Sequence, residues 1–260
     1  MPTPISATAP GPWLLAHDVA RVAALDYVIA ENARSARGFL KRLPLQRPLQ
    51  AIEIVELNEH TPPTAVEPML APLLNGRDAA LMSEAGCPGV ADPGAALVLA
   101  AHRAGILVEP LVGPSALLLA LMACGLNGNR FAFAGYLPVD AAQRAQALRA
   151  LEARSQRDRE TILMIETPYR NQALFDALTA TLHPATLLTV AGDVTGTAQS
   201  IVTREIVQWR LHRDPLPRVP TVFLLLGAAR GGDVSAAQIR PSPPPARARA
   251  PRPPRRRRPG

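Results

Sequence analysis

The chain has 260 residues, of which 48% are apolar, enough to fill the cores of one large or two medium α/β domains. Its net charge of +7 is typical of a nucleic-acid-binding protein, but eight arginines and no acid follow residue 239, so residues 1–239 carry a net charge of −1. No apolar run approaches the roughly 20 residues of a membrane span, and Cys87 and Cys124 lack the spacing of a metal site or a disulfide framework. These features argue against a membrane protein or a zinc protein and favour a cytoplasmic one that holds no metal.

In the first half of the chain, segments with strand and helix patterns alternate. The apolar spacing predicts helices over 14–25 and 34–43, strands over 27–30 and 51–57, and a helix over 64–74 that Pro68 and Pro72 interrupt. A strand, a loop and a helix then occur twice in succession, over 79–103 and over 106–124. Such alternation predicts parallel β-α-β units.

After Gly128 the pattern changes to one that can form a separate mixed sheet. It predicts strands over 131–137, 161–166, 187–191, 197–202 and 221–227, and helices over 141–155, 169–182 and 204–211. The fold class is therefore α/β, with an N-terminal α/β domain over 1–112 and a C-terminal α/β domain over 113–230. The remaining segment, 231–260, is rich in Arg and Pro and is expected to be disordered, either binding RNA weakly or having no defined role.

The stretch 79–94, AALMSEAGCPGVADPG, joins a short apolar strand to a helix through a loop rich in Gly and Pro. In open α/β sheets, ligands bind beyond the carboxyl ends of the strands. A rigid loop with little side chain at that place is a candidate ligand site, although a purely structural turn is the alternative.

Several motifs along the chain together resemble a known family. The segments IAENARSARGFL (29–40), SEAGCPGVADPG (83–94), PLVGPSALLLAL (110–121), FAFAGYLP (131–138) and MIETPYRN (164–171) are similar to the tetrapyrrole methylase superfamily of methyltransferases that use S-adenosylmethionine. They are most similar to its bacterial branch that methylates a cytidine ribose 2′-hydroxyl in small-subunit ribosomal RNA. The resemblance covers about residues 2–227.

The resemblance implies two α/β domains with S-adenosylmethionine in the cleft between them, and a homodimer that acts on rRNA or the small ribosomal subunit. Position by position, it implies cofactor contacts from Ser83, Glu84, Gly86, Cys87, Val90, Ser115, Ala116, Tyr136 and Met164. Glu84 could instead cap backbone N–H groups, and Cys87 could be a small apolar filler. Asp92, before Pro93, is interpreted as a turn residue.

Methyl transfer to a ribose hydroxyl is helped by a general base, and the acid that ends the first predicted strand is the first candidate. The expected catalytic group is Glu31, Asn32 and Arg34, although Glu31 could instead serve only as an acid at a helix start. Arg37, one helical turn after Arg34, and Arg170 are the expected substrate-binding residues, because guanidinium groups bind phosphates.

The chain also departs from the family pattern. Asn32, Glu84, Cys87 and Tyr169 replace the usual Asp, Asp, Thr and His, and GDVTG (192–196) replaces a segment with an acid and a lysine. An apolar strand expected before Pro2 is missing, which suggests a start upstream of Met1. Two other functions therefore stay open: methylation of a tetrapyrrole or other small molecule, and an RNA-associated binding protein that keeps the cofactor pocket without catalysis.

Overall fold

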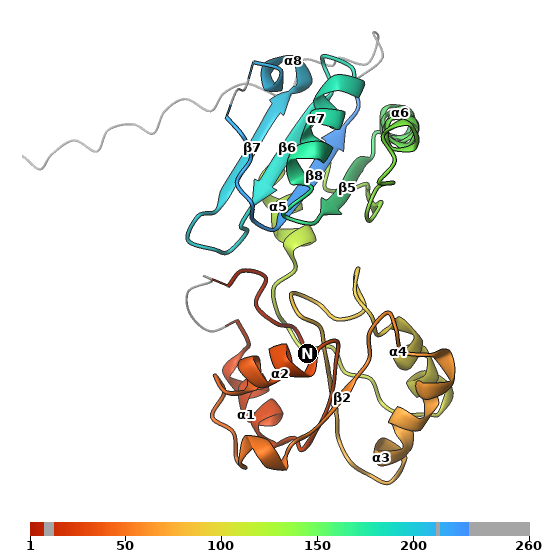
Figure 1. Cartoon of the computed structure of the whole chain (residues 1–260), viewed down its shortest axis with the longest axis vertical. Coiled ribbons are helices and arrows are strands. Elements are labelled where there is room, and N and C mark those ends of the chain that lie inside the picture. The colour runs from red at the N-terminus through yellow and green to blue at the C-terminus, as the bar shows by residue number, and fades with distance from the viewer. Residues whose placement is uncertain (8–12, 212–213, 229–260) are drawn as a thin grey trace, which may run out of the picture. The chain divides into compact units, whose positions relative to one another are not determined.

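The computed structural model describes residues 1–7, 13–211 and 214–228, which belong to one compact unit, Met1–Ala228. The predicted disordered tail falls outside the described residues. Two separate sheets, with helices packed on each, make up the described chain (Figure 1). The predicted α/β class is confirmed, whereas the boundary at residue 113 and the cleft between two domains stay predictions.

The first sheet is parallel and has the strand order β2-β1-β3. Its strands are β1 (Tyr27–Ala30), β2 (Glu53–Glu56) and β3 (Ala80–Met82). The central strand β1 is buried along its whole length, and its side chains alternate between two cores. Val28 and Ala30 pack with residues of α1 and α2 on one face, and Tyr27 and Ile29 pack with the segment before β3 and with α4 on the other.

The helices around this sheet follow the predicted order. They are α1 (Ala16–Ala24), α2 (Ala33–Leu40), α3 (Ala71–Leu74) and α4 (Ala95–Arg103), with short 3-10 turns at Leu49–Ala51, Pro63–Ala65 and Glu67–Leu70. The expected helix over 64–74 is divided into these last two turns and α3. The division falls beside Pro68 and Pro72, because proline cannot donate the hydrogen bond that a continuous helix needs.

The strand expected over 106–111 does not form, although the helix after it does. One edge of β3 pairs with β1, and the first residues of the chain lie along the other edge. The Met1 amine donates to the Leu81 carbonyl oxygen at 2.7 Å, and Thr3 pairs with Gly86 in an antiparallel bridge. Residues 106–111 therefore lack a strand partner.

The second sheet is mixed, as predicted, with the order β4-β5-β8-β6-β7, in which only β4 and β5 are parallel. Its elements are α5 (Ala116–Cys124), β4 (Phe131–Phe133), α6 (Ala141–Asp158), β5 (Thr161–Glu166), α7 (Asn171–Thr181), β6 (Leu187–Gly192), β7 (Ser200–Glu205), α8 (Ile206–Trp209) and β8 (Thr221–Leu226). Successive side chains of β5 point to opposite faces of this sheet, as those of β1 do in the first sheet. Met164 packs with α6, α7 and α8, and Leu163 packs with α5.

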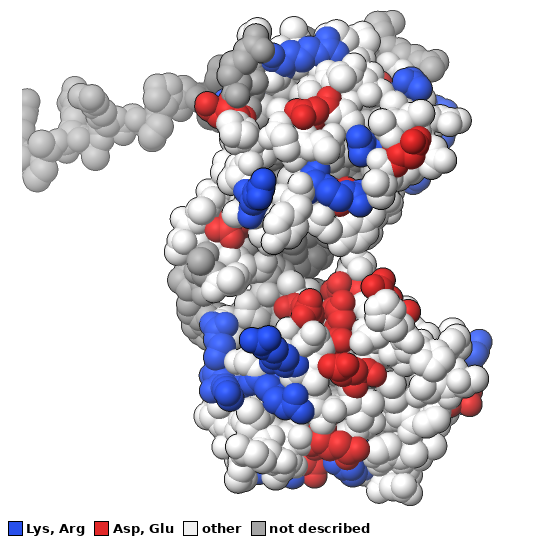
Figure 2. Space-filling model, in the orientation of Figure 1, with Lys and Arg blue, Asp and Glu red and all other residues white. Residues whose placement is uncertain are grey.

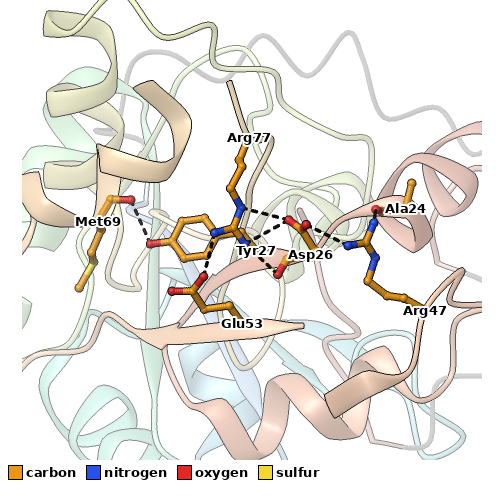
Figure 3. Close-up of polar contacts among 7 residues, drawn as sticks. All are labelled: Ala24, Asp26, Tyr27, Arg47, Glu53, Met69 and Arg77. Carbon is orange, nitrogen blue, oxygen red and sulfur yellow. Dashed lines mark hydrogen bonds and ion pairs between the residues drawn. The ribbon is translucent and has the colours of Figure 1, made fainter. Parts of the chain in front are cut away.

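A polar network holds the amino-terminal ends of the first sheet together (Figure 3). Arg77 binds Glu53 at 2.9 Å and Asp26 at 3.2 Å, and Arg47 binds Asp26 from the other side at 2.9 Å. The hydrogen bond from Arg77, followed by the nearby positive charges, lowers the pKa of Asp26. This network lies at the opposite end of the strands from the predicted ligand loop, so we assign it a structural role.

Candidate functional site

The carboxyl ends of β1 and β3 bring two predicted site segments into contact. The Glu31 N–H continues the ladder to the Met82 carbonyl oxygen at 3.1 Å, and the Glu31 carboxylate accepts from the Glu84 N–H at 3.1 Å. A predicted catalytic acid and a predicted cofactor residue, 53 positions apart in sequence, therefore touch. This is the edge where α/β sheets bind ligands.

Helix α2 begins at this edge and is capped by Asn32. The Asn32 side-chain oxygen accepts from the N–H groups of Arg34 and Ser35 at 2.9 and 3.0 Å, and the Ser35 hydroxyl donates to the Glu84 carboxylate at 2.7 Å. Asn32 was predicted to be catalytic, but its side-chain oxygen accepts the hydrogen bonds that cap the start of α2. Asn32 therefore fixes the start of α2, and Ser35 in the first turn of that helix contacts the 83–94 loop.

The 83–94 loop has an unusual backbone. Gly86, Gly89 and Ala91 have positive φ angles of 76°, 78° and 65°, in the left-handed region where glycine is favoured. At Gly86 the approach is also close, because an added Cβ would lie 3.2 Å from a methyl carbon of Ile5. The predicted loop is therefore present, and it lacks a side chain at Gly86, where another segment crosses it.

The segment that crosses the loop is the N-terminal peptide, which we call the N-terminal strap (residues 2–6). Thr3 and Gly86 exchange backbone hydrogen bonds of 2.9 and 3.2 Å, and Pro2 lies so close to Gly113 that an added Cβ there would be 2.2 Å away. The Cys87 thiol donates to the Pro114 carbonyl oxygen at 3.4 Å. The strap thus joins the loop to the 113–115 turn, whose Ser115 hydroxyl accepts from the Leu118 N–H at 3.5 Å and caps α5.

The strap also reaches the second sheet. Ile5 belongs to the core cluster around α5, and the Ser6 hydroxyl donates to the buried Asp193 carboxylate at 2.6 Å. Asp193 also accepts from the Ala198 N–H at 2.9 Å, so it holds the 192–196 loop in place. No local pattern in the sequence indicates this role of the strap, because its partners are more than 80 residues away.

Asp92 is the residue that the sequence interpretation underestimated. Burial, then the neighbouring Glu31 carboxylate, raises the pKa of Asp92 to about 6; a hydrogen bond with Ser83 opposes the rise and the Glu84 carboxylate adds to it. Burial and the charge of Asp92 also raise the pKa of Tyr136. Three carboxylates therefore crowd together at this edge, which favours a cationic ligand there.

The remaining predicted residues fall into three groups. Val90 and Tyr136 are exposed, at 47% and 56%. Ala116 is the first residue of α5, and its partly buried side chain packs against the core between α5 and the second sheet. Met164 is fully buried in the core of the second sheet, so its side chain cannot reach a ligand without leaving that core.

The basic residues predicted for the site, Arg34 in the catalytic group and Arg37 and Arg170 as substrate-binding residues, differ in whether they form ion pairs. Arg170 is paired with the buried Glu166 at 2.6 Å, so much of its charge is already neutralised. Arg34 and Arg37 are exposed and have no ion pair among the residues that the structure describes. Within the described ranges there is no cluster of metal-ligand side chains, and no helix is long and apolar enough to cross a membrane.

The family described as Tetrapyrrole (Corrin/Porphyrin) Methylases matches residues 14–207. Three similar proteins are named Ribosomal RNA small subunit methyltransferase I. The one from Xylella fastidiosa is 33% identical over 82% of this chain and 74% of its own length; those from Escherichia coli and Mesorhizobium japonicum are 34% and 36% identical over 68% and 70% of this chain. The chain spans 59% of the length of each of the last two.

Two solved structures have the same fold. The methyltransferase CobJ superposes with a TM-score of 0.55 at 21% identity, covering 84% of this chain and 91% of CobJ. A uroporphyrin-III-C-methyltransferase from Thermus thermophilus superposes with a TM-score of 0.50 at 19% identity, covering 85% and 91%. At these identities the likeness extends to the fold alone.

Proposed function

The chain belongs to the tetrapyrrole methylase family, in the branch of the small-subunit rRNA methyltransferases, and on that premise we propose that it transfers a methyl group from S-adenosylmethionine to a ribose 2′-hydroxyl of small-subunit rRNA. The observation that carries this proposal is the contact between Glu31 and the 83–94 loop at the carboxyl ends of β1 and β3. Through this contact the candidate base is next to the candidate cofactor loop. A cytoplasmic location is a further part of the proposal.

The residues around the loop suit this cofactor. S-adenosylmethionine, when bound, supplies an electrophilic methyl group on a positively charged sulfur. Glu31, Glu84 and Asp92 gather negative charge at one place, and burial, followed by repulsion from the other two carboxylates, raises the pKa of Asp92. A ligand with positive charge would relieve that repulsion, whereas an anionic ligand would increase it.

Each part of the chain has a distinct task in the proposed site. The missing side chain of Gly86 makes room for Ile5 of the strap, and the contact of Cys87 with Pro114 fixes the loop against the 113–115 turn. Tyr136 and Val90 are exposed and can cover a bound cofactor. Met164 is not part of the proposed cofactor contacts, because its side chain is buried among α6, α7 and α8.

Methyl transfer needs the acceptor oxygen aligned with the methyl group, and most of the acceleration comes from such positioning. Glu31 would accept the proton of the ribose hydroxyl, since its carboxylate is held by the Glu84 N–H and is only partly buried. Asn32, the next residue, fixes the start of α2.

A homodimer is part of the proposal. Helix α5 is apolar on all sides, and Leu118 and Met122 are 52% and 80% exposed although α5 packs against the second sheet. Phe131 on the edge strand β4 is also exposed. Light scattering on the purified chain should give twice the monomer mass, and a monomer that methylates at full rate would contradict this part.

The experiment that tests the activity uses purified chain, small ribosomal subunits that lack the modification, and S-adenosylmethionine with a labelled methyl group. Incorporation into rRNA ribose is expected, and Glu31→Gln should lower kcat by about 100-fold, the lower range for a general base. Binding of S-adenosylmethionine, measured by calorimetry, should survive in that variant. Incorporation into a small molecule but not into RNA would overturn the substrate proposal.

A further inference from the structure

Four cations gather on the solvent side of α2 and just beyond its end, and we call this the basic face of α2: Arg34, Arg37, Lys41 and Arg42. All four are exposed, and none has an ion-pair partner within the part of the chain that the structure describes. Most other arginines that line the first sheet are paired, as Arg21 is with Glu109. The charge of the basic face is therefore available to an external anion.

This arrangement weakens the isolated helix. Arg34 and Arg37 are three residues apart and Arg37 and Lys41 four, so like charges are neighbours along one face, each pair destabilising by about 0.2–0.5 kcal/mol. Arg34 also lies in the first turn, which holds no acid and where the helix dipole disfavours a positive charge. The Asn32 cap and the Glu56 carboxylate, which accepts from the Ala33 N–H at 2.8 Å, stabilise the start of the helix, but neither forms an ion pair with the four cations. A bound polyanion would relieve the repulsion among these cations.

A glycine lies in the middle of the basic face. Gly38 is four residues after Arg34 and three before Lys41, and a Cβ added to it would meet no atom within 4 Å. No packing requires glycine here, and glycine within a helix costs about 1 kcal/mol relative to alanine. Its effect is to leave the helix surface bare between the cations, where the backbone of a ligand can come close.

The basic face is also oriented and connected to the candidate site. The guanidinium of Arg42 stacks over the Trp13 ring at 3.9 Å, which limits its freedom. At the other end, Ser35 donates to Glu84 in the cofactor loop. Figure 2 shows basic residues gathered over the region of α2 beside a group of acidic ones.

We propose that the basic face of α2 binds consecutive phosphates of the RNA substrate, while Gly38 receives the sugar-phosphate backbone. Arg34 to Lys41 spans about 10 Å along the helix, enough for two or three phosphates of one strand. A strand held there would present its ribose toward Glu31, which directly precedes the helix cap. The identity of the anion as RNA rests on the proposed function.

The test compares the double variant Arg37→Ala/Lys41→Ala with the control Arg103→Ala/Arg149→Ala, which removes two exposed arginines on other helices. Full-length small-subunit rRNA is titrated by filter binding between 50 and 300 mM salt. Each phosphate contact contributes about 0.7–0.9 to the slope of log K against log salt. The test variant should lower that slope by about 1.5 and weaken binding about 25- to 60-fold near 0.1 M salt, and the control by less than twofold. Every protein keeps the Arg-rich tail, so the tail cancels in the comparison.

A third variant, Gly38→Leu, adds bulk without changing charge. It should weaken RNA binding at least fivefold and leave the salt slope unchanged, while thermal unfolding reports an intact fold. An unchanged affinity would overturn the role of Gly38. Equal losses of RNA affinity in the test and control double variants would overturn the basic face as a site. The test double variant is also mixed with anionic phospholipid vesicles. If it loses vesicle binding but keeps its RNA affinity, the RNA assignment is overturned.

The outcomes separate this inference from the proposed function. If the chain transfers no methyl group but the double variant still loses RNA affinity selectively, the activity fails and the basic face stands. If the double variant methylates with unchanged KM for the ribosomal substrate, the activity stands and the basic face fails. Unchanged S-adenosylmethionine binding in all variants is expected, because the basic face does not belong to the cofactor loop.

Discussion

Asp92 provides a direct test of the electrostatics at the candidate site. Its pKa is raised from 3.8 to about 6 by burial and by the Glu31 carboxylate, so the folded chain holds the Asp92 proton more tightly than the unfolded chain does. For an acid whose pKa is higher in the folded chain, the negative charge does not reduce folding stability below the pKa of the unfolded chain. Above the pKa of the folded chain, the charge reduces stability by its full amount. Asp92 should therefore reduce stability progressively as the pH rises from about 4 through about 6.

The size of this effect follows from the shift. About two pKa units correspond to about 3 kcal/mol, and solvent screening at this partly exposed edge reduces that to about 1–2 kcal/mol. Asp92→Asn keeps the shape and a hydrogen-bonding oxygen but removes the charge. At pH 7.5 the variant should melt about 2–8 °C higher than the unchanged chain, because 1 kcal/mol shifts Tm by about 2–4 °C in a chain of this size.

The assay is thermal unfolding followed by circular dichroism at pH 4.5 and at pH 7.5, with Asp78→Asn as the control for removal of an exposed carboxylate. The difference in Tm between Asp92→Asn and the unchanged chain should shrink at pH 4.5 to about a third of its value at pH 7.5, because pH 4.5 lies only a little above the unfolded pKa of 3.8. A variant that is less stable at pH 7.5, or an equal difference at both pH values, would refute the argument that crowded carboxylates destabilise this edge.

Three further substitutions test the packing and the loop. Gly113→Ala should lower Tm by several degrees, since its Cβ would lie 2.2 Å from Pro2, whereas Gly128→Ala, with open space around it, should not; circular dichroism melts distinguish them. Ser6→Ala should destabilise by about 1–3 kcal/mol in denaturant titrations, because it leaves a buried carboxylate without its hydroxyl donor, and a loss under 0.5 kcal/mol would contradict that role. Glu84→Ala should weaken S-adenosylmethionine binding about fivefold by calorimetry, through loss of negative charge near the sulfonium, and unchanged affinity would remove Glu84 from the proposed cofactor site.

Much of the fold follows from local pattern. The position of β1, the interruption beside Pro68 and the mixed character of the second sheet all follow from apolar patterning and proline chemistry. Residues 106–111 have strand-forming composition but form no strand, because a strand needs a partner and local sequence does not specify one. Whether residues 106–111 pair as a strand depends on which segment lies along the other edge of β3, and the tertiary structure determines that.

The candidate site likewise combines features that local sequence predicts with features that depend on tertiary contacts. The positions of Glu31 and the 83–94 loop were predictable, since both follow strands of a parallel sheet. The raised pKa of Asp92 was not predictable, because it depends first on burial and then on carboxylates that come close only in the folded chain. The bond between Ser6 and Asp193 likewise joins segments 187 positions apart, and no sequence period reports such a contact.

The central claim is ribose methylation of small-subunit rRNA, and the most direct measurement is a map of 2′-O-methyl groups in that RNA from a strain lacking this chain. We predict that one site loses its methyl group and regains it when the unchanged chain is restored, but not when Glu31→Gln is supplied at the same level. A map that is identical with and without the chain would contradict the account.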